Sequence, residues 1–144
     1  MANYAKKFLR SGDPTEDVLH RTKLFHTDSV LCGLSALALK TNAPTVLKKE
    51  ATLTKSREIS YKKQPNFALT FGETEVNDYL KSICANMSAV REWDSNGTVF
   101  GYREGKKDFQ AGEFGHNDFY PVVVASAFFN SKIDGKTALN AMIL

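Results

Sequence analysis

The sequence predicts a mainly α-helical domain with long buried helices and a short extended or hairpin excursion near residues 57–71. Three observations lead to this fold class. Apolar residues recur at spacings of three and four in several segments, which is the period of a helix with one buried face. Capping patterns stand before two of these segments, at residues 13–16 and 134–137. The helical pattern stops only between Thr54 and Gly72 and in the glycine-containing stretch of residues 92–116.

Two helices are expected in the N-terminal part of the chain. Tyr4, Phe8 and Leu9 have helical spacing before a Ser-Gly pair, which predicts a short amphipathic helix. Residues 13–16, Asp-Pro-Thr-Glu, predict the start of a second helix with an N-cap aspartate, proline at the first helical position and an acid at the third. This helix becomes apolar nearly all round from Leu31 to Leu39, so we expect that end to be buried between other elements.

The middle of the chain predicts a short helix, extended pieces and a third long helix. The short helix opens at the Asn-Ala-Pro of residues 42–44. Residues 57–61 and 67–71, separated by Gln-Pro-Asn, favour short extended pieces or a hairpin. Thr74 is expected to cap the third long helix. The apolar stripe of that helix is Val76, Leu80, Ile83 with Cys84, Met87 and Val90.

The C-terminal part predicts a loop and two helices. Residues 92–116 contain five glycines without periodicity, which indicates a loop. The apolar segment from Pro121 to Phe129 favours a buried helix, and Asp134 is expected to cap a last helix from Ala138 to Leu144. That helix stops on an apolar run without a C-cap, so we expect residues 1–144 to be the N-terminal portion of a larger helical domain.

Composition argues against several classes of protein. Residues 1–65 carry 12 Lys and Arg against 6 Asp and Glu, but the basic residues form no dense face interleaved with aromatics, so no nucleic-acid partner is expected. The longest apolar stretch, near Val30 to Leu39, has about ten residues, which is too short to cross a membrane. The N-terminus has no secretory signal, so we expect a cytoplasmic or mitochondrial protein that is not secreted.

The cysteines and histidines do not predict a metal site or a cofactor. Cys32 and Cys84 are far apart, and no ligand set with local spacing can be written from them and the histidines. His20 and His26 are six residues apart, which does not place them on one helical face, and we interpret both as structural. We expect no metal and no cofactor.

Residues 92–118 collect the groups that suit acid–base chemistry. Asp94 is a candidate base if it is buried, His116 a candidate acid or base, and Thr98 a candidate contact for a substrate carboxylate or hydroxyl. A second interpretation is that Asp94 and Asp118 cap the neighbouring loop and helix. Likewise, His116 can be a structural or surface histidine.

Four segments, in order, resemble the MmgE/PrpD family. They are A-N-Y-A-K-K-F-L with the following P-T-E-D-V-L-H-R-T-K-L-F-H-T-D-S-V-L-C-G-L-S-A-L-A, F-G-E-T-E at residues 71–75, A-N-M-S-A-V-R-E-W-D-S-N-G-T at residues 85–98, and G-E-F-G-H-N-D-F-Y-P-V-V-V-A-S-A at residues 112–127. The family includes 2-methylcitrate dehydratases and cis-aconitate decarboxylases, which act on tricarboxylates without an iron–sulfur cluster. The resemblance therefore implies a lyase with a small tricarboxylate substrate.

Carried over position by position, the resemblance implies three site residues. Asp94 and Thr98 fall on the first Asp and the Thr of the family's D-x-x-x-T motif, and His116 falls on its His. Asp94 and His116 would then transfer protons while Thr98 orients the substrate. The chain departs from the pattern where Ser-Asn-Gly at residues 95–97 replaces Phe-Asp-Asp, and where Arg91 replaces the usual His. Asn-Asp at residues 117–118 also replaces the family's Pro-Ser.

The resemblance also bears on domain organisation and partners. Family members are longer chains with a large all-helical domain and a smaller α+β lid domain. We therefore expect residues 1–144 to lack the C-terminal remainder and the lid, and to hold at most half of the site. Family members are homodimers, and self-association is expected through the apolar residues of Val122 to Phe129 and Ala138 to Leu144.

Three functions remain open at this point. The first is dehydration of 2-methylcitrate or a related tricarboxylate, and the second is decarboxylation of the cis-aconitate type. The third is a catalytically silent helical fragment or short isoform that binds a partner or a full-length paralogue.

Overall fold

The computed structural model describes residues 1–54, 67–95, 98–99, 105, 113–130 and 132–144. Within these ranges the chain forms six α-helices, one 3-10 helix and two short antiparallel strand pairs, so the mainly α fold is confirmed. The extended piece predicted at residues 57–61 lies outside the described ranges.

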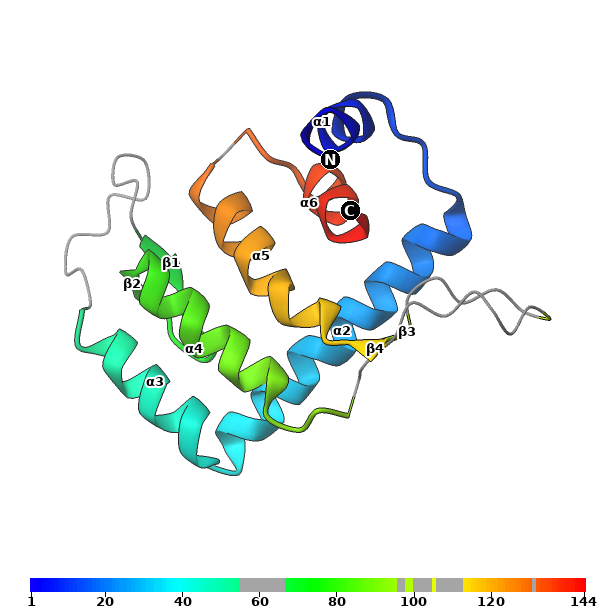
Figure 1. Ribbon diagram of the computed structural model, residues 1–144. Coiled ribbons are helices and arrows are strands. Elements are labelled where there is room, and N and C mark those ends of the chain that lie inside the picture. The colour runs from blue at the N-terminus through cyan, green and yellow to red at the C-terminus, as the bar shows by residue number, and fades with distance from the viewer. Residues whose placement is uncertain (55–66, 96–97, 100–104, 106–112, 131) are drawn as a thin grey trace.

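Helix α4 (Tyr79–Arg91) lies between α3 (Asn42–Thr52) and α5 (Tyr120–Phe129) and also packs against α2 (Glu16–Ala38) (Figure 1). Helices α1 (Ala2–Ser11) and α6 (Gly135–Ile143), from the two ends of the chain, lie together. In chain order the elements are α1 (Ala2–Ser11), α2 (Glu16–Ala38), α3 (Asn42–Thr52), β1 (Phe67–Leu69), β2 (Val76–Asp78), α4 (Tyr79–Arg91), β3 (Thr98–Val99), β4 (Glu113–Phe114), the 3-10 helix η1 (His116–Phe119), α5 (Tyr120–Phe129) and α6 (Gly135–Ile143).

Helix α2 begins two residues after the predicted proline. The hydroxyl of Thr15, not the carboxylate of Asp13, accepts a hydrogen bond from the Val18 N–H at 3.4 Å, so the predicted cap is wrong. Because Glu16 is the first helical residue, Asp13 and Pro14 both lie before the helix, and Thr15 occupies the N-cap position. Capping at Thr15 also leaves Glu16 and Asp17 in the first turn, where the helix dipole favours negative charge.

The buried face of α2 consists of small residues. Ser29, Gly33 and Ala36 are buried there. A Cβ atom at Gly33 would lie 2.8 Å from Cε2 of Phe71 and 3.5 Å from the backbone nitrogen of Val90. Glycine at this position therefore allows α2 to approach α4 and the segment that follows β1.

The expected burial of the leucines at the end of α2 is wrong. Leu31, Leu34 and Leu39 are 60%, 43% and 68% exposed. The close contact is made by the small residues of the opposite face, so these leucines point away from it. No single helix in the described ranges is long and apolar enough to span a bilayer; α2 and α3 satisfy length and composition only together, bent by 88°.

Helix α4 starts at Tyr79 rather than at the predicted Thr74. Residues 76–78 form β2 and pair with β1, with Ala68 opposite Asn77. The Asp78 carboxylate then caps the helix by accepting a hydrogen bond from the Lys81 N–H at 3.0 Å.

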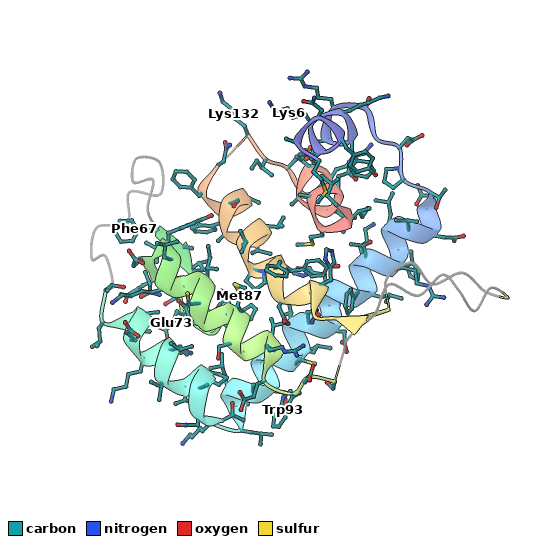
Figure 2. The ribbon with its side chains drawn as sticks, in the orientation of Figure 1. Lys6, Phe67, Glu73, Met87, Trp93 and Lys132 are labelled. Atoms are coloured by element: carbon teal, nitrogen blue, oxygen red, sulfur yellow. The ribbon has the colours of Figure 1, made fainter. Side chains whose placement is uncertain are left out.

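The predicted apolar stripe of α4 is only partly buried. Ile83 and Val90 are buried, but Leu80 is 68% exposed and Cys84 is also exposed. Met87, labelled in Figure 2, packs against the buried cluster at the centre of the fold. The buried positions of α4 are Ser82, Ile83, Ala85, Asn86, Ala89 and Val90.

The C-terminal helices follow the prediction in type. Helix α5 is formed by the predicted apolar segment, yet only Tyr120, Pro121 and Ala125 are buried in it. Helix α6 is capped by Asp134 as predicted, through a 2.8 Å hydrogen bond from the Thr137 N–H, and begins at residue 135. The hydrogen bonds from Thr137 hold the pKa of the Asp134 carboxyl below its usual value.

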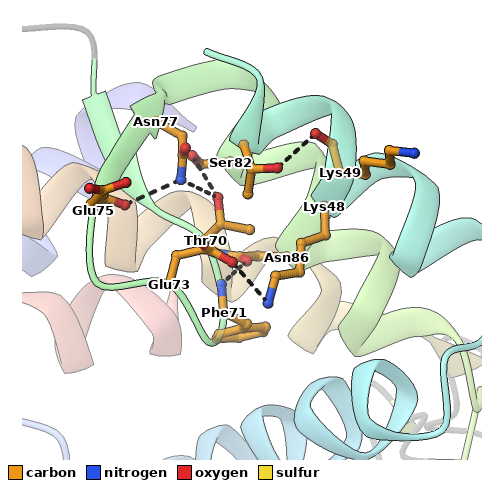
Figure 3. Close-up of polar contacts among 10 residues, drawn as sticks. Lys48, Lys49, Thr70, Phe71, Glu73, Glu75, Asn77, Ser82 and Asn86 are labelled. Atoms are coloured by element: carbon orange, nitrogen blue, oxygen red, sulfur yellow. Dashed lines mark hydrogen bonds and ion pairs between the residues drawn. The ribbon is translucent and has the colours of Figure 1, made fainter. Parts of the chain in front are cut away.

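Polar side chains of α4 bond the backbone of β1 and of Phe71, which follows it, and Figure 3 draws the contact of Asn86 with Phe71. The Asn86 side chain accepts a hydrogen bond from the Phe71 N–H at 2.9 Å and donates one to the Leu69 carbonyl at 3.0 Å. The Ser82 hydroxyl donates to the Ala68 carbonyl at 3.1 Å. Because β1 pairs with β2 alone, backbone groups on its other edge have no strand partner, and these side chains bond that edge instead.

Further contacts in Figure 3 join the hairpin to itself, to α4 and to α3. Buried Thr70 donates to the Ser82 hydroxyl at 3.1 Å and accepts from the Asn77 amide at 3.2 Å. Lys48 of α3 forms an ion pair with Glu73 in the turn between the strands, at 3.2 Å. The hairpin, α3 and α4 are thereby connected through polar groups as well as apolar packing.

Replacing Asn86 by alanine tests this attachment. The change leaves the Phe71 N–H and the Leu69 carbonyl without their partner, and we expect it to lower the free energy of unfolding by about 2 kcal/mol. Cys84→Ala, at an exposed position of the same helix, is the matched control and should change it by less than about 0.5 kcal/mol. Urea unfolding of both variants measures the difference, and equal values would contradict the role given to Asn86.

Candidate functional site

The predicted base, Asp94, lies in a tight turn that follows α4. The Asp94 N–H donates to the Arg91 carbonyl at 3.0 Å, and the backbone of Asp94 has a φ of 47°. Aspartate is among the few residues that tolerate this left-handed conformation. The next residue, Ser95, contacts the Cys32 sulfur at 3.7 Å, which attaches the turn to α2.

Arg91 stands between two carboxylates. Its Nη1 lies 2.7 Å from Oδ1 of Asp94, and its Nε lies 3.7 Å from Oδ2 of Asp118. The side chains of Arg91 and Asp94 are 49% and 64% exposed, whereas that of Asp118 is only 21% exposed. The guanidinium therefore joins the end of α4, the turn after it and the 3-10 helix η1.

The pairing of β3 with β4 brings the same two segments side by side. Thr98 lies opposite Phe114, and Val99 lies opposite Glu113, in antiparallel register. Thr98 is thus on a backbone adjacent to the strand that ends just before His116; its side chain lies outside what the structure describes.

Gly115 allows Arg91 and Asp118 to approach each other. A Cβ atom at this position would collide with Oδ2 of Asp118 and would lie 2.8 Å from Nη1 of Arg91. Any other residue would therefore displace one partner of the ion pair. The carbonyl of Gly115 also accepts a hydrogen bond from the Asp118 N–H at 3.0 Å, which closes the first turn of η1.

His116 is turned toward the C-terminal helices. Its Nε2 lies 3.0 Å from the carbonyl oxygen of Met142 in α6. Its ring also meets the ring of Tyr120 edge-on, with centroids 5.5 Å apart and planes at 83°. His116 is therefore held by α5 and α6, while Asp94 is held by α2 and α4.

Tyr120 connects the site with α2. It is 3% exposed, and burial raises the pKa of its hydroxyl to about 12. The rings of Phe25 and His26 each meet it edge-on at 5.7 Å. Burial lowers the pKa of His26, so this ring is neutral at physiological pH, which fits the structural role predicted for it.

A small cavity lies beside this aromatic cluster, between α2, α4 and α5. Its volume is about 70 Å³, room for about two water molecules, and its lining is mainly apolar. His26, Asn86 and Tyr120 are among the residues that line it. In the described part of the chain no group of three or more His, Cys, Asp or Glu residues could hold a metal ion.

Electrostatics distinguish the two carboxylates next to Arg91. Burial raises the pKa of Asp118; the guanidinium of Arg91 opposes this rise, and the nearby carboxylate of Asp94 adds to it. Asp118 is not the N-cap of α5, because that position is Phe119, which makes no side-chain capping hydrogen bond. The described contact of the Asp118 carboxylate is the ion pair with Arg91.

The structure thus brings together the segments that carry Asp94, Thr98 and His116, whose catalytic roles stay predictions. Sequence reasoning did not identify Arg91 as the connecting residue, although its spacing of three from Asp94 is the spacing of a helical ion pair. No sequence motif indicated Tyr120 or Met142 as contacts of His116, because they contact it from the separate helices α5 and α6.

Asp118→Asn tests the burial of this carboxylate. A carboxyl whose pKa is raised on folding binds more protons in the folded than in the unfolded protein, so its contribution to stability is present at low pH and is lost as pH rises through the folded pKa. As pH rises from the usual pKa of an aspartate through the raised pKa of folded Asp118, we expect the free energy of unfolding of the variant to increase relative to that of the wild type. Urea unfolding at several pH values measures this difference. Asp28→Asn on the exposed side of α2 is the control. A relative stability that falls with pH would contradict the prediction.

Comparison of the chain with protein-family models, with curated proteins and with solved structures finds no match.

Proposed function

We propose that this chain carries the acid–base residues of a lyase that removes water from 2-methylcitrate or a related tricarboxylate without an iron–sulfur cluster. The resemblance of the motifs around Asp94, Thr98 and His116 to the MmgE/PrpD family suggests the reaction. The observation that carries the proposal is the bridge by Arg91, which contacts Asp94 and also Asp118, two residues after His116.

The reaction needs a base and an acid on neighbouring segments. The Asp94 carboxylate takes the proton from the carbon next to a substrate carboxylate, and the C–H electron pair becomes the new C=C bond. The C–O bond breaks with its electrons on oxygen, and the His116 imidazolium gives that oxygen a proton, so water leaves. The proton on Asp94 then returns to His116 through solvent, which restores both groups.

Arg91 supplies positive charge where the substrate brings negative charge. Two carboxylates beside each other would repel a tricarboxylate, and the guanidinium between them offsets one of their two negative charges. Its half-exposed side chain also leaves the Asp94 carboxylate open to solvent while fixing its orientation. Thr98 is the proposed orienting residue for a substrate carboxylate or hydroxyl.

Turnover by purified protein tests the proposal. 2-Methylcitrate, citrate and cis-aconitate are incubated separately, and alkene absorbance and released CO2 are followed. Asp94→Asn and His116→Gln should each lower the rate of dehydration by about 10²- to 10⁴-fold, the usual contribution of general acid–base catalysis. Asp28→Asn and His20→Gln make the same chemical changes at exposed positions of α2 and should leave the rate unchanged.

The other outcomes lead to different functions. CO2 release from cis-aconitate without dehydration, abolished by the same two variants, would replace the dehydratase by a decarboxylase. Folded protein without turnover of any of the three substrates would contradict the lyase.

A silent module that binds a partner is the second candidate function. It is favoured by the apolar surface of α5, where four side chains are 37% to 43% exposed: Val122, Val124, Phe128 and Phe129. Self-association through α5 is the simplest form of such binding. Sedimentation of the wild type beside Phe128→Ser and Phe129→Ser variants would show it as a loss of dimer.

A further inference from the structure

The contact between His116 and α6 determines which ring nitrogen carries the proton. Nε2 of His116 lies 3.0 Å from the carbonyl oxygen of Met142. A carbonyl oxygen can only accept a hydrogen bond, so Nε2 must be the donor and must carry a hydrogen. The neutral imidazole has one ring hydrogen, and with that hydrogen on Nε2 the lone pair lies on Nδ1.

The ring of Tyr120 restrains the plane of the same imidazole from a second side. It meets the His116 ring edge-on at 83°, and Tyr120 itself is 3% exposed and surrounded by Phe25 and His26. Turning the imidazole by half a revolution would place a carbon where Nε2 now donates and would lose the hydrogen bond to Met142. The packing and the hydrogen bond therefore favour one orientation and one tautomer together.

We propose that α6 and Tyr120 position His116 as the Nε2–H tautomer, so that Nδ1 is the atom that exchanges a proton with the substrate. The assignment of Nδ1 to the reaction rests on the proposed lyase function, whereas the tautomer does not. In the imidazolium, Nδ1 gives its proton to the leaving oxygen while Nε2 keeps its hydrogen bond to Met142. After that step the ring is neutral with its hydrogen on Nε2. Met142, through its backbone carbonyl, and Tyr120 are thus positioning residues.

Nitrogen NMR of protein with isotope-labelled histidine tests the tautomer directly. At a pH above the observed titration of the ring, the His116 signals should show a hydrogen-bearing Nε2 and an unprotonated Nδ1. The signals are assigned by their loss in His116→Gln, and exposed His20 in the same spectrum is the internal reference for an unconstrained ring. A hydrogen on Nδ1, or the averaged pattern of His20, would overturn the proposal.

Replacing Tyr120 distinguishes positioning from general stability. Tyr120→Phe keeps the ring edge and should keep the Nε2–H pattern, whereas Tyr120→Leu should move the His116 signals toward those of His20. Unchanged signals in folded Tyr120→Leu would show that Tyr120 does not position the ring.

A pair of amide variants separates the two nitrogens. The amide of His116→Gln reaches the place of Nε2 and can donate to the Met142 carbonyl, whereas that of His116→Asn reaches only the place of Nδ1. We expect His116→Asn to have an unfolding equilibrium constant roughly tenfold larger than that of His116→Gln, the effect of about one hydrogen bond. Equal stability would overturn the part given to Met142.

The turnover assay distinguishes an error in this inference from an error in the proposed function. An Nε2–H signal in a protein without lyase activity would leave the positioning by α6 in place and remove the role of Nδ1 in dehydration. Dehydration by a protein whose His116 carries its hydrogen on Nδ1 would leave the lyase in place and overturn the positioning.

Discussion

The helices of this fold approach one another closely because the residues at their contacts are small. Helix α4 meets its neighbours through Ala85 and Ala89, α2 contributes Gly33, and α3 and α5 contribute Ala51 and Ala125, all of them buried. Such residues let the backbones approach closely, so stability comes from many short van der Waals contacts rather than from a few large side chains. Leucines, which need more space, are therefore left on the outer faces of α2 and α4.

Polar contacts at the start, in the middle and at the end of α4 add to this close packing. Asp78 caps the first turn, and the side chain of Asn86 bonds the backbone of the hairpin strand. At the other end, Arg91 binds Asp94 and Asp118. Arg91 belongs to the central helix α4 and also forms the ion pairs of the candidate site. The position of the site therefore depends on the packing of α4.

Features that depend on residues close together in the sequence are predicted better than features that depend on contacts between distant residues. Helical periodicity and the Asp134 cap are local, and the corresponding helices form where expected. The first residue of α4 is determined by a non-local contact, because residues 76–78 pair with β1 as strand β2. The helix therefore begins after this strand and is capped by Asp78, not by the predicted Thr74. Asp94 and His116 were named from motif resemblance, and their catalytic roles stay predictions. The hydrogen bond from His116 to Met142 spans 26 residues and no spacing rule predicts it.

The two proposed proton-transfer groups are held by different parts of the fold. Asp94 is fixed by Arg91 of α4 and, through Ser95, by Cys32 of α2. His116 is fixed by Tyr120 of α5 and by the Met142 carbonyl of α6. The strand pair β3–β4 and the ion pair from Arg91 to Asp118 join these two supports. Because proton transfer depends steeply on the distance between base, substrate and acid, a shift of α5 and α6 against α2 and α4 would change the rate of the proposed reaction without altering any residue in contact with the substrate.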